Sequence, residues 1–217
     1  MNILITGSSS GIGRTTALKF LAEGHDVAGI DILPPTITDC KFTAYKADVS
    51  EPDSLPPIPD IEVLVNNAGI QSGREMDIMT NLLGVIYCTE AYGLQPKIKS
   101  ICNVASASAH SGAEFPMYAA SKGGVLAYTK HIAMQIAKWD ATCNSISPGG
   151  VTTALNAPVM DDPEKWAEIM NETPLKKWAE PEEIADWIYF MTVQNKSMTA
   201  QDILVDNGEI ARSNFVW

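Results

Sequence analysis

The stretch of sequence that decides the fold is Ile3-Leu4-Ile5-Thr6-Gly7-Ser8-Ser9-Ser10-Gly11-Ile12-Gly13. Its apolar start favours a strand, and a segment of helical period follows its last glycine. Glycines permit a tight turn and let the backbone approach a ligand closely, while the start of a helix offers unpaired N–H groups to an anion. The G-x-x-x-G-x-G spacing differs from the commoner G-x-G-x-x-G, and a glycine cluster can be an ordinary turn. Its place between the first strand and the first helix favours a pyrophosphate site. The candidate contacts are Gly7, Ser9, Gly11, Ile12 and Gly13.

Short apolar runs alternate along the chain with longer segments of helical period. Several runs are β-branched or wholly apolar, which is typical of strands buried on both faces of a parallel sheet. The predicted strands are Ile3–Thr6, Val27–Ile30, Phe42–Tyr45, Val63–Val65, Ser100–Val104, Cys143–Ser147 and Ile203–Val205. The predicted helices are Ile12–Glu23, Glu75–Leu94, Met117–Trp139, Pro163–Asn171 and Pro181–Val193. This pattern predicts a doubly wound α/β fold in one domain over residues 1–217, with a seven-stranded parallel sheet and helices on both faces.

Two connections contain too many prolines for a helix interior, and we predict that both are loops. Leu33–Cys40 contains Pro34 and Pro35, and Ser50–Asp60 contains four prolines.

The composition excludes several classes of function. The net charge of −11 argues against nucleic acid and anionic membranes as partners. The chain shows neither a signal-peptide pattern at its start nor an apolar run near the roughly 18 residues of a membrane span, so we expect a cytoplasmic protein. The four cysteines are widely separated and the three histidines lack a metal-ligand spacing. We therefore predict reduced thiols and no metal site.

Asp31 ends the second predicted strand, eighteen positions after Gly13. A carboxylate there would accept hydrogen bonds from the hydroxyls of an adenosine ribose and would repel a 2′-phosphate. Neither Ser10 nor the residues directly after Asp31 supply a cation for such a phosphate. Alternatively, Asp31 is an ordinary residue of a strand-end turn. Together with the glycine turn upstream, it predicts NAD(H) in preference to NADP(H).

Tyr118 and Lys122 lie four residues apart in a predicted helix, so both side chains share one face. A free phenol has a pKa near 10, which makes it a poor base at neutral pH. A neighbouring ammonium would lower that pKa and let the phenol exchange a proton with a substrate oxygen. The pair alone is weak evidence, because an exposed helix carries such pairs by chance.

Four motifs follow one another along the chain: Thr6–Gly13, Asn66-Asn67-Ala68-Gly69, Tyr118 with Lys122, and Pro148-Gly149. In order and approximate spacing they resemble the short-chain dehydrogenase/reductase family over nearly the whole chain. The resemblance implies a Rossmann-like fold. It also implies an NAD(H)-dependent oxidoreductase that interconverts a secondary alcohol and a carbonyl, including carbonyls of the 3-oxoacyl type, by hydride transfer.

The resemblance also implies a role for each catalytic residue. Tyr118 would be the acid/base, and Lys122 would lower its pKa and hold the nicotinamide ribose. Ser106 would hydrogen-bond the reacting oxygen, although it lies about one residue closer to Tyr118 than expected, so Ser108 is an alternative. Asn81 would hold a water in a proton relay from the lysine, or it is simply a polar residue within a long helix.

Further cofactor contacts are implied in the same way. The stretch that contains Asn67, Ala68 and Gly69 would lie beside the adenosine ribose. Asp48 would meet the adenine amino group, with Val49 beside it. The turn from Pro148 to Thr153 would grip the nicotinamide carboxamide. Its candidate contacts are Pro148, Gly149, the backbone of Val151 and the hydroxyl of Thr153. Thr153 is equally suited to cap a helix.

The sequence departs from the family pattern in three shortened connections, which follow Asp31, follow Asp48 and precede Asn81. They affect the expected walls of the adenine pocket.

On the substrate side, residues 154–178 carry apolar side chains among charged ones, and in the family this region forms a lid over substrate and nicotinamide. Tyr92, His110 and Phe115 are possible liners of the pocket. No arginine is placed to clamp a carboxylate, so a neutral carbonyl compound or alcohol is the expected substrate.

The family commonly forms dimers or tetramers through two long central helices, here 75–94 and 117–139. We therefore expect a homodimer or homotetramer, although contacts within the core would explain the same apolar faces. Two other functions stay open: a non-catalytic NAD(H)-sensing protein on the same fold, and an NAD-dependent epimerase or dehydratase.

Overall fold

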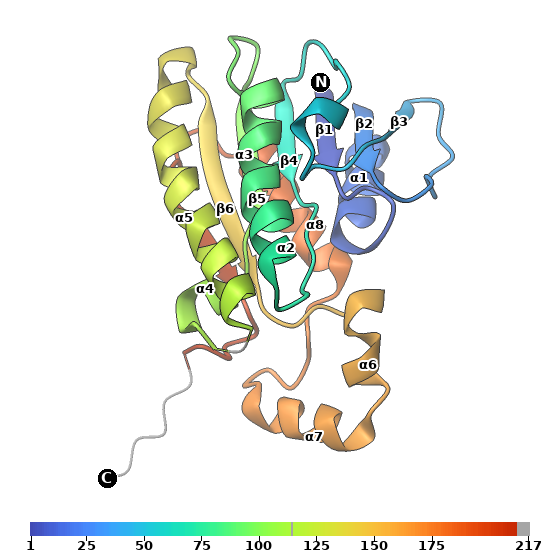
Figure 1. Cartoon of the computed structure of the whole chain (residues 1–217), viewed down its shortest axis with the longest axis vertical. Coiled ribbons are helices and arrows are strands. Elements are labelled where there is room, and N and C mark those ends of the chain that lie inside the picture. Colours follow the sequence, from blue (N-terminus) through green and yellow to red (C-terminus); the bar gives the residue numbers. More distant parts are fainter. Residues whose placement is uncertain (114, 212–217) are drawn as a thin grey trace.

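The computed structural model describes residues 1–113 and 115–211. It contains one seven-stranded sheet whose strands are all parallel, in the order β3-β2-β1-β4-β5-β6-β7 (Figure 1). The strands are β1 (Asn2–Thr6), β2 (Asp26–Asp31), β3 (Phe42–Lys46), β4 (Val63–Asn66), β5 (Ser100–Val104), β6 (Thr142–Pro148) and β7 (Asp202–Val205). The predicted fold class and all seven predicted strands are confirmed, each to within a residue or two at its ends.

The strand order reverses between β1 and β4, which are neighbours in space but not in sequence. In open α/β sheets, ligands bind outside the carboxyl ends of the strands at such a reversal. The glycine turn after β1 lies at this point, so the topology places the predicted pyrophosphate site where a ligand is expected.

Helices cover both faces of the sheet (Figure 1). One face is covered by α1 (Gly11–Ala22) and α8 (Pro181–Tyr189), which pack against each other. The other face is covered by α5 (Pro116–Ile136) and by the segment α2 (Glu75–Asp77), η2 (Ile78–Leu83), α3 (Gly84–Cys88) and η3 (Thr89–Gly93). The remaining elements are η1 (Pro52–Ser54), α4 (Ser108–Ser111), η4 (Ala137–Trp139), η5 (Ala154–Asn156), α6 (Ala157–Met160), α7 (Pro163–Glu172) and η6 (Phe190–Gln194).

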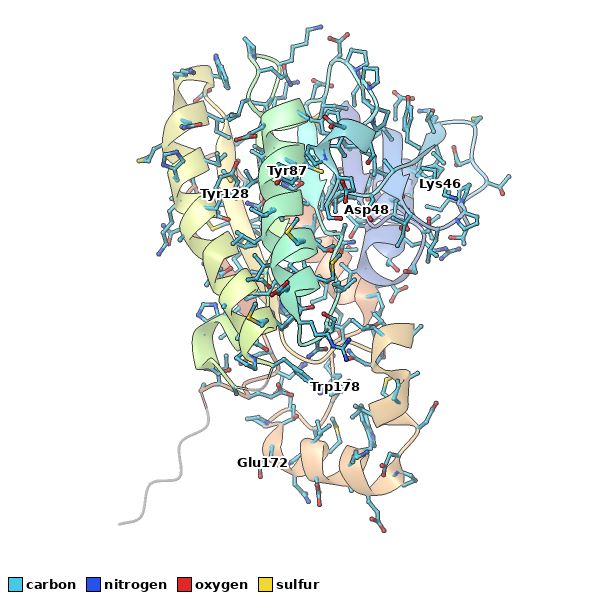
Figure 2. All side chains as sticks on the ribbon, viewed as in Figure 1. Lys46, Asp48, Tyr87, Tyr128, Glu172 and Trp178 are labelled. Atoms are coloured by element: carbon cyan, nitrogen blue, oxygen red, sulfur yellow. The ribbon has the colours of Figure 1, made fainter. Side chains whose placement is uncertain are left out.

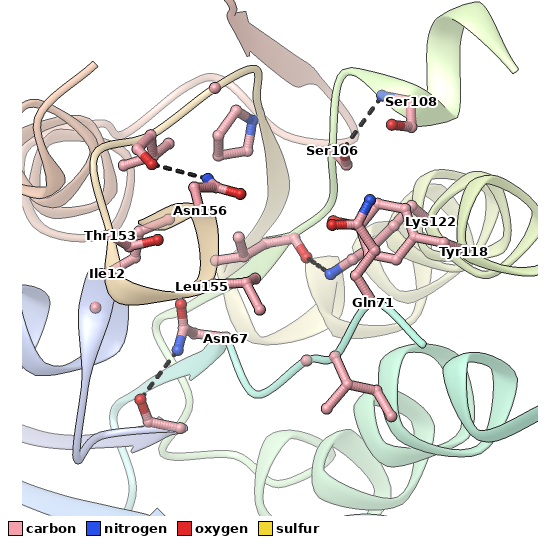
Figure 3. A pocket seen from close by; sticks show the side chains of 18 of the residues that line it. Ile12, Asn67, Gln71, Ser106, Ser108, Tyr118, Lys122, Thr153, Leu155 and Asn156 are labelled. Carbon is pink, nitrogen blue, oxygen red and sulfur yellow. Dashed lines mark hydrogen bonds between the residues drawn. The ribbon is translucent and has the colours of Figure 1, made fainter. Parts of the chain in front are cut away.

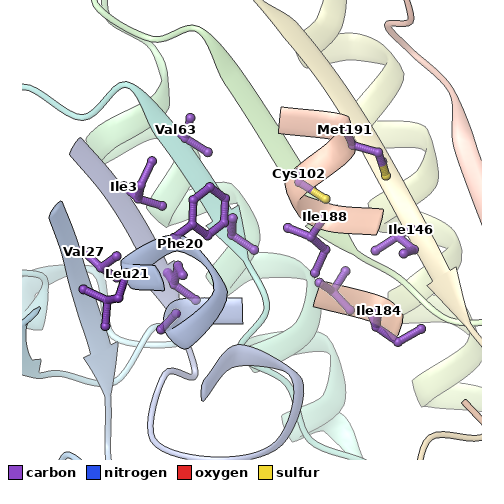
Figure 4. Close-up of a cluster of buried hydrophobic side chains, with 14 of the residues drawn as sticks. Ile3, Phe20, Leu21, Val27, Val63, Cys102, Ile146, Ile184, Ile188 and Met191 are labelled. Carbon is purple, nitrogen blue, oxygen red and sulfur yellow. The ribbon is translucent and has the colours of Figure 1, made fainter. Parts of the chain in front are cut away.

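An apolar core fills the space between the sheet and the α1–α8 pair (Figure 4). Ile3 from β1 meets Phe20 from α1, and Ile184 and Ile188 from α8 close the cluster; all four side chains are fully buried. A second cluster on the opposite face includes Leu4, next to Ile3 in the chain. Successive strand residues therefore point into different cores, which explains why β1 is apolar without alternation.

The two proline-containing connections lack the long crossover helices found elsewhere in the molecule. Leu33–Cys40 contains no helix, and Ser50–Asp60 contains only the single turn η1. Both predictions of loops are confirmed apart from this turn. As a consequence β3 lies at the edge of the sheet with three of its five residues exposed, whereas β4 and β5 are buried throughout.

The predicted helix 75–94 is present, but its turns alternate between α and π geometry. The π turns are η2 and η3, and η2 carries Asn81. Such wide turns often occur at functional sites. Gly84, the first residue of α3, lets this segment approach the sheet layer closely, because a Cβ there would lie 2.7 Å from Val49 Cγ2.

Candidate active site

A single cavity of about 1360 Å³ lies at the carboxyl ends of the strands. Most of the predicted site residues line it, from the glycine turn through Tyr118 and Lys122 to the turn after β6. The predicted residues in its wall are Gly7, Gly11, Ile12, Asp31, Asp48, Val49, Asn67, Ala68, Gly69, Ser106, Ser108, Tyr118, Lys122, Pro148, Gly149, Val151 and Thr153. Ser9, Gly13 and Asn81 do not line it. The volume exceeds that of a typical drug-sized site, which suits an extended ligand.

The glycine turn is closed by backbone contacts that exclude side chains. A Cβ on Gly13 would lie 2.1 Å from the carbonyl oxygen of Gly7, and one on Gly7 would lie 2.8 Å from Asn67 Nδ2. Gly7 has a left-handed backbone with φ of 69°. The Asn67 amide donates to the carbonyl of Thr6 at 2.9 Å and to that of Gly7 at 3.2 Å, which ties the turn after β4 to the turn after β1. Gly13 therefore serves the packing of the turn rather than direct ligand contact.

Both predicted carboxylates at the adenosine end are held by neighbouring polar groups. Asp31 accepts from the backbone N–H of Ser9 and of Leu33, each at 2.8 Å. Asp48 Oδ1 accepts from the backbone and the hydroxyl of Ser50, at 2.9 and 2.7 Å. Each carboxylate keeps acceptor capacity for a ligand, because two oxygens offer about four lone-pair positions. Ser9 thus acts through its backbone to position Asp31.

Tyr118 and Lys122 project from α5 into the cavity near Ser106 (Figure 3). The Ser106 hydroxyl lies close enough to the Tyr118 phenol to lower its pKa. Lys122 is only 4% exposed, and its Nζ donates to the carbonyl of Val104 at 2.8 Å and lies 5.7 Å from the centre of the Tyr118 ring. Burial lowers the pKa of Lys122 to about 8, against the charge of Asp77, which raises it.

The predicted lowering of the Tyr118 pKa by Lys122 is wrong for this structure. Burial raises the pKa of Tyr118, and this effect outweighs that of the nearby Ser106 hydroxyl, which lowers it. The physical reason is that the phenol is largely withdrawn from water, while the Lys122 ammonium is directed to the carbonyl of Val104.

The Ser106 hydroxyl accepts from the backbone N–H of Ser108 at 3.2 Å (Figure 3). Ser106 is also the serine whose hydroxyl lowers the pKa of Tyr118, which favours it over Ser108 as the neighbour of the phenol. Ser108 lines the cavity one turn further on, at the start of α4.

Asn81 is fully buried, and its side chain is engaged with neighbouring protein groups. Its Oδ1 accepts from the backbone N–H of Ile70, and its Nδ2 donates to the Ile70 carbonyl, both at 2.8 Å. The same amide nitrogen lies 3.2 Å from Ser121 Oγ. The side chain therefore holds residue 70 in place.

The turn after β6 is organised by side chains that sequence reasoning missed. Asn156 donates to the carbonyl of Val151 at 2.8 Å, and Trp178 packs so closely on Gly150 that a Cβ there would lie 2.0 Å from the indole. Trp178 lies between the sheet and α7 (Figure 2). Thr153 occupies the N-cap position of η5, yet its side chain makes no capping hydrogen bond. Its hydroxyl is therefore available to a ligand, in keeping with the predicted role.

Other residues of the site were also missed. Asp77 is fully buried, and its charge acts on both Tyr118 and Lys122. Its position four residues before Asn81 could have indicated a shared helix face. Gln71 and Glu209 line the cavity without belonging to any motif. Of the three possible liners, Phe115 lines the cavity. Tyr92 instead donates to the carbonyl of Pro56, and His110 pairs with Asp202 at 2.8 Å.

Within residues 1–113 and 115–211, no helix combines the length and the apolar character needed to cross a membrane.

The sequence matches known oxidoreductases over nearly its whole length. Residues 7–209 match a family model described as enoyl-(acyl carrier protein) reductase. A 2-dehydro-3-deoxy-D-gluconate 5-dehydrogenase of Escherichia coli (strain K12) is 29% identical over 96% of this chain and 95% of that protein. A 3-oxoacyl-(acyl-carrier-protein) reductase of Thermotoga maritima is 32% identical over 94% of this chain and 96% of that protein.

Solved structures show the same fold. An aldohexose dehydrogenase of Thermoplasma acidophilum superposes with a TM-score of 0.86 at 28% identity, covering 100% of this chain and 96% of that one. A 4-hydroxyisoleucine dehydrogenase complexed with NADH gives 0.87 at 26% identity, covering 98% and 99%. A putative 2-deoxy-D-gluconate 3-dehydrogenase of Agrobacterium tumefaciens with bound NADP gives 0.86 at 25% identity, covering 97% and 96%.

Proposed function

Because the chain belongs to the short-chain dehydrogenase/reductase family, whose relatives interconvert alcohols and carbonyls, we propose that it is an NAD(H)-dependent oxidoreductase with Tyr118 as its acid/base. The observation that carries this proposal is that Ser106, Tyr118 and Lys122 line one cavity, with the ammonium of Lys122 buried 5.7 Å from the centre of the Tyr118 ring. A sensor of cofactor concentration has no need of such an arrangement.

The residues present suit a nicotinamide dinucleotide. The glycine turn leaves room at Gly11, where a Cβ would meet only Thr153 at 3.5 Å, so that backbone can approach a pyrophosphate. Asp31 and Asp48 would accept hydrogen bonds from the ribose and adenine, and the free hydroxyl of Thr153 faces the carboxamide end. A bound nicotinamide would accept or supply the hydride at its C4 atom.

Side chains of this protein would carry out the proton transfer at the substrate oxygen. The Ser106 hydroxyl would position that oxygen beside the phenol of Tyr118. Since burial raises the pKa of Tyr118, the phenol is protonated at neutral pH and can donate its proton during carbonyl reduction. In the opposite direction the phenolate would accept the alcohol proton. Lys122, with a pKa of about 8, is largely an ammonium at neutral pH and would hold the nicotinamide ribose.

The preference for NAD(H) rests on Asp31. Its carboxylate is held toward the cavity by two backbone N–H groups, and a 2′-phosphate placed there would be repelled. Thermal-shift titrations with NADH and NADPH test this. We expect the melting temperature to rise at lower concentrations of NADH than of NADPH, and equal effects of the two would contradict the preference.

The catalytic proposal is tested by an NAD⁺ reduction screen over diverse secondary alcohols, with Tyr118→Phe as the comparison. The variant keeps the ring and its packing but loses the transferable proton, so kcat should fall at least about 100-fold. NADH binding should persist, because the ring stays in place. Activity of the variant at the full rate would exclude Tyr118 as acid/base. Tight NADH binding with no turnover across the panel would favour the sensing function.

A further inference from the structure

A short strap over residues 70–73 forms part of the cavity wall, and its first residue is fixed by Asn81. The Asn81 side chain binds both backbone groups of Ile70, accepting from the N–H and donating to the carbonyl, each at 2.8 Å. Gly69 precedes this contact, and a Cβ there would lie 3.0 Å from Asn81 Oδ1. At the start of the strap, both backbone hydrogen-bonding groups of Ile70 are therefore paired with one side chain, that of Asn81.

The other end of the strap is fixed by Asp77. Its Oδ1 accepts from the backbone N–H and the hydroxyl of Ser72, both at 2.7 Å, and its Oδ2 accepts from the N–H of Gly73 at 2.9 Å. Asp77 and Asn81 are four residues apart on one helical segment, and both are fully buried. A buried carboxylate with three hydrogen bonds is costly to disturb. The two side chains thus clamp the strap from one helix.

Gln71 is the strap residue between the two clamped ends. Its side chain lines the cavity and points toward Tyr118 (Figure 3). Within the part of the chain that the structure describes, the Gln71 amide makes no hydrogen bond. A rigid backbone therefore presents a free donor and a free acceptor beside the proposed acid/base.

We propose that Gln71 is a specificity-determining residue, which binds a hydroxyl on the carbon next to the reacting carbon of the substrate. This inference rests on the proposed function, because it takes the reacting oxygen to lie at Tyr118 and Ser106. A hydroxyl both donates and accepts, and the Gln71 amide offers the complementary acceptor and donor. The substrate class is then an alcohol with a neighbouring hydroxyl group, as in polyhydroxylated compounds, rather than a monofunctional alcohol.

The test compares cis-cyclohexane-1,2-diol with cyclohexanol, which differ by that hydroxyl group. For the wild type, kcat/KM with NAD⁺ should be higher for the diol. Gln71→Leu keeps the approximate size of the side chain and removes its hydrogen bonds, so the ratio of diol to cyclohexanol activity should fall about 3- to 10-fold. Gln201→Leu, at an exposed glutamine outside the cavity, is the matched control and should leave the ratio unchanged.

A binding measurement separates this inference from the proposed chemistry. Quenching of NADH fluorescence reports the affinity of each compound for the NADH-bound protein without turnover. Tighter binding of the diol that is lost in Gln71→Leu supports the role of Gln71, even if neither compound is oxidised and the proposed activity fails. No preference for the diol in turnover or binding, or a preference that survives Gln71→Leu, overturns it.

Asp77 is a positioning residue in this scheme, and a double variant tests it. Asp77→Asn replaces one of the two accepting oxygens by an amide nitrogen, so the strap should loosen and the diol-to-cyclohexanol ratio should fall. In the Gln71→Leu background, Asp77→Asn should lower the ratio no further, because the Gln71 amide that Asp77 helps to position is already absent. The ratio cancels effects of Asp77 on Lys122 that act equally on both substrates. Additive losses would show that Asp77 does not act through Gln71.

Discussion

Burial sets the chemistry of single residues in this site. Lys122 and Tyr118 are both withdrawn from water, so each resists its charged form: the pKa of the lysine falls to about 8 and that of the tyrosine rises. In the glycine turn, too, neighbouring groups decide which residue a position can hold. Gly13 is required not by a ligand but by the carbonyl of Gly7, which lies where its Cβ would be.

At Gly13, replacement by alanine should damage the turn. The added methyl group would lie 2.1 Å from backbone that cannot move freely, so we expect a loss of about 1–3 kcal/mol in the free energy of unfolding, together with weaker NADH binding. Gly123→Ala is the matched control, since a Cβ there meets nothing within 4 Å. In a helix that change should be neutral or stabilising by up to about 1 kcal/mol. Urea denaturation measures both, and equal stability of the two variants would refute the packing argument.

The low pKa of Lys122 predicts a dependence of stability on pH. The unfolded chain holds this proton up to about pH 10.5, whereas the folded protein releases it near pH 8. The unfolded state thus binds more protons between these values, and the free energy of unfolding rises with pH across that window. Lys122→Met should remove this contribution. Urea denaturation at pH 7.5, 8.5 and 9.5 should show the wild type gaining stability relative to the variant, and parallel curves would contradict the shift.

At the scale of elements, side chains on the helical segments fix the loops that form the cavity wall. The π turn η2 carries Asn81, and with Asp77 one turn earlier it fixes the strap over residues 70–73. On the opposite side of the cavity, α7 has no buried residue, and Trp166 meets Trp178 edge to face at 5.0 Å between ring centres. Within the proposed lid, residues 154–178, this contact holds α7 to Trp178, which in turn packs on Gly150 in the turn after β6.

Removing that contact should loosen the lid without unfolding the domain. For Trp166→Ala we expect KM to rise about 3- to 10-fold, since an edge-to-face aromatic pair contributes about 0.5–1.5 kcal/mol. Cleavage within residues 154–172 during limited proteolysis should also become faster. Trp187→Ala is the control, because Trp187 makes a similar contact with Phe190 away from the cavity. Equal KM values for the two variants would count against the lid.

At the scale of the whole molecule, a single sheet gathers residues from distant parts of the sequence. The segments that follow all seven strands meet at the carboxyl edge, which is why one cavity contains residues as far apart as Gly7 and Glu209. The two helical segments named as an interface, 75–93 and α5, lie side by side on one outer face (Figure 1). Met134 on α5 is 66% exposed there.

That outer face supports the expectation of a homodimer or homotetramer. Light scattering coupled to size exclusion should give a mass two or four times the 23.4 kDa of one chain. Met134→Glu would place a charge on the face and should lower the measured mass, whereas Leu18→Glu, on α1, should not. A monomer at every concentration would exclude the assembly.

The sequence alone was sufficient for the fold and for most of the cavity wall. Buried parallel strands must be apolar on both sides, so their positions could be predicted directly, and glycine, tyrosine and lysine at fixed spacings marked the turn and the proposed catalytic pair. The contacts of Asp77 and Trp178 could not be predicted. Their partners are backbone groups and a ring from other segments, and no local pattern encodes them.

Local sequence thus determined which segments become strands and helices, because periodicity and turn chemistry act between near neighbours. Only the tertiary structure decided that the pKa of Tyr118 is raised rather than lowered, and that the side chain of Asn81 holds the strap over residues 70–73. These properties depend on burial and on contacts between residues far apart in the chain, which exist only once the sheet has brought its carboxyl ends together.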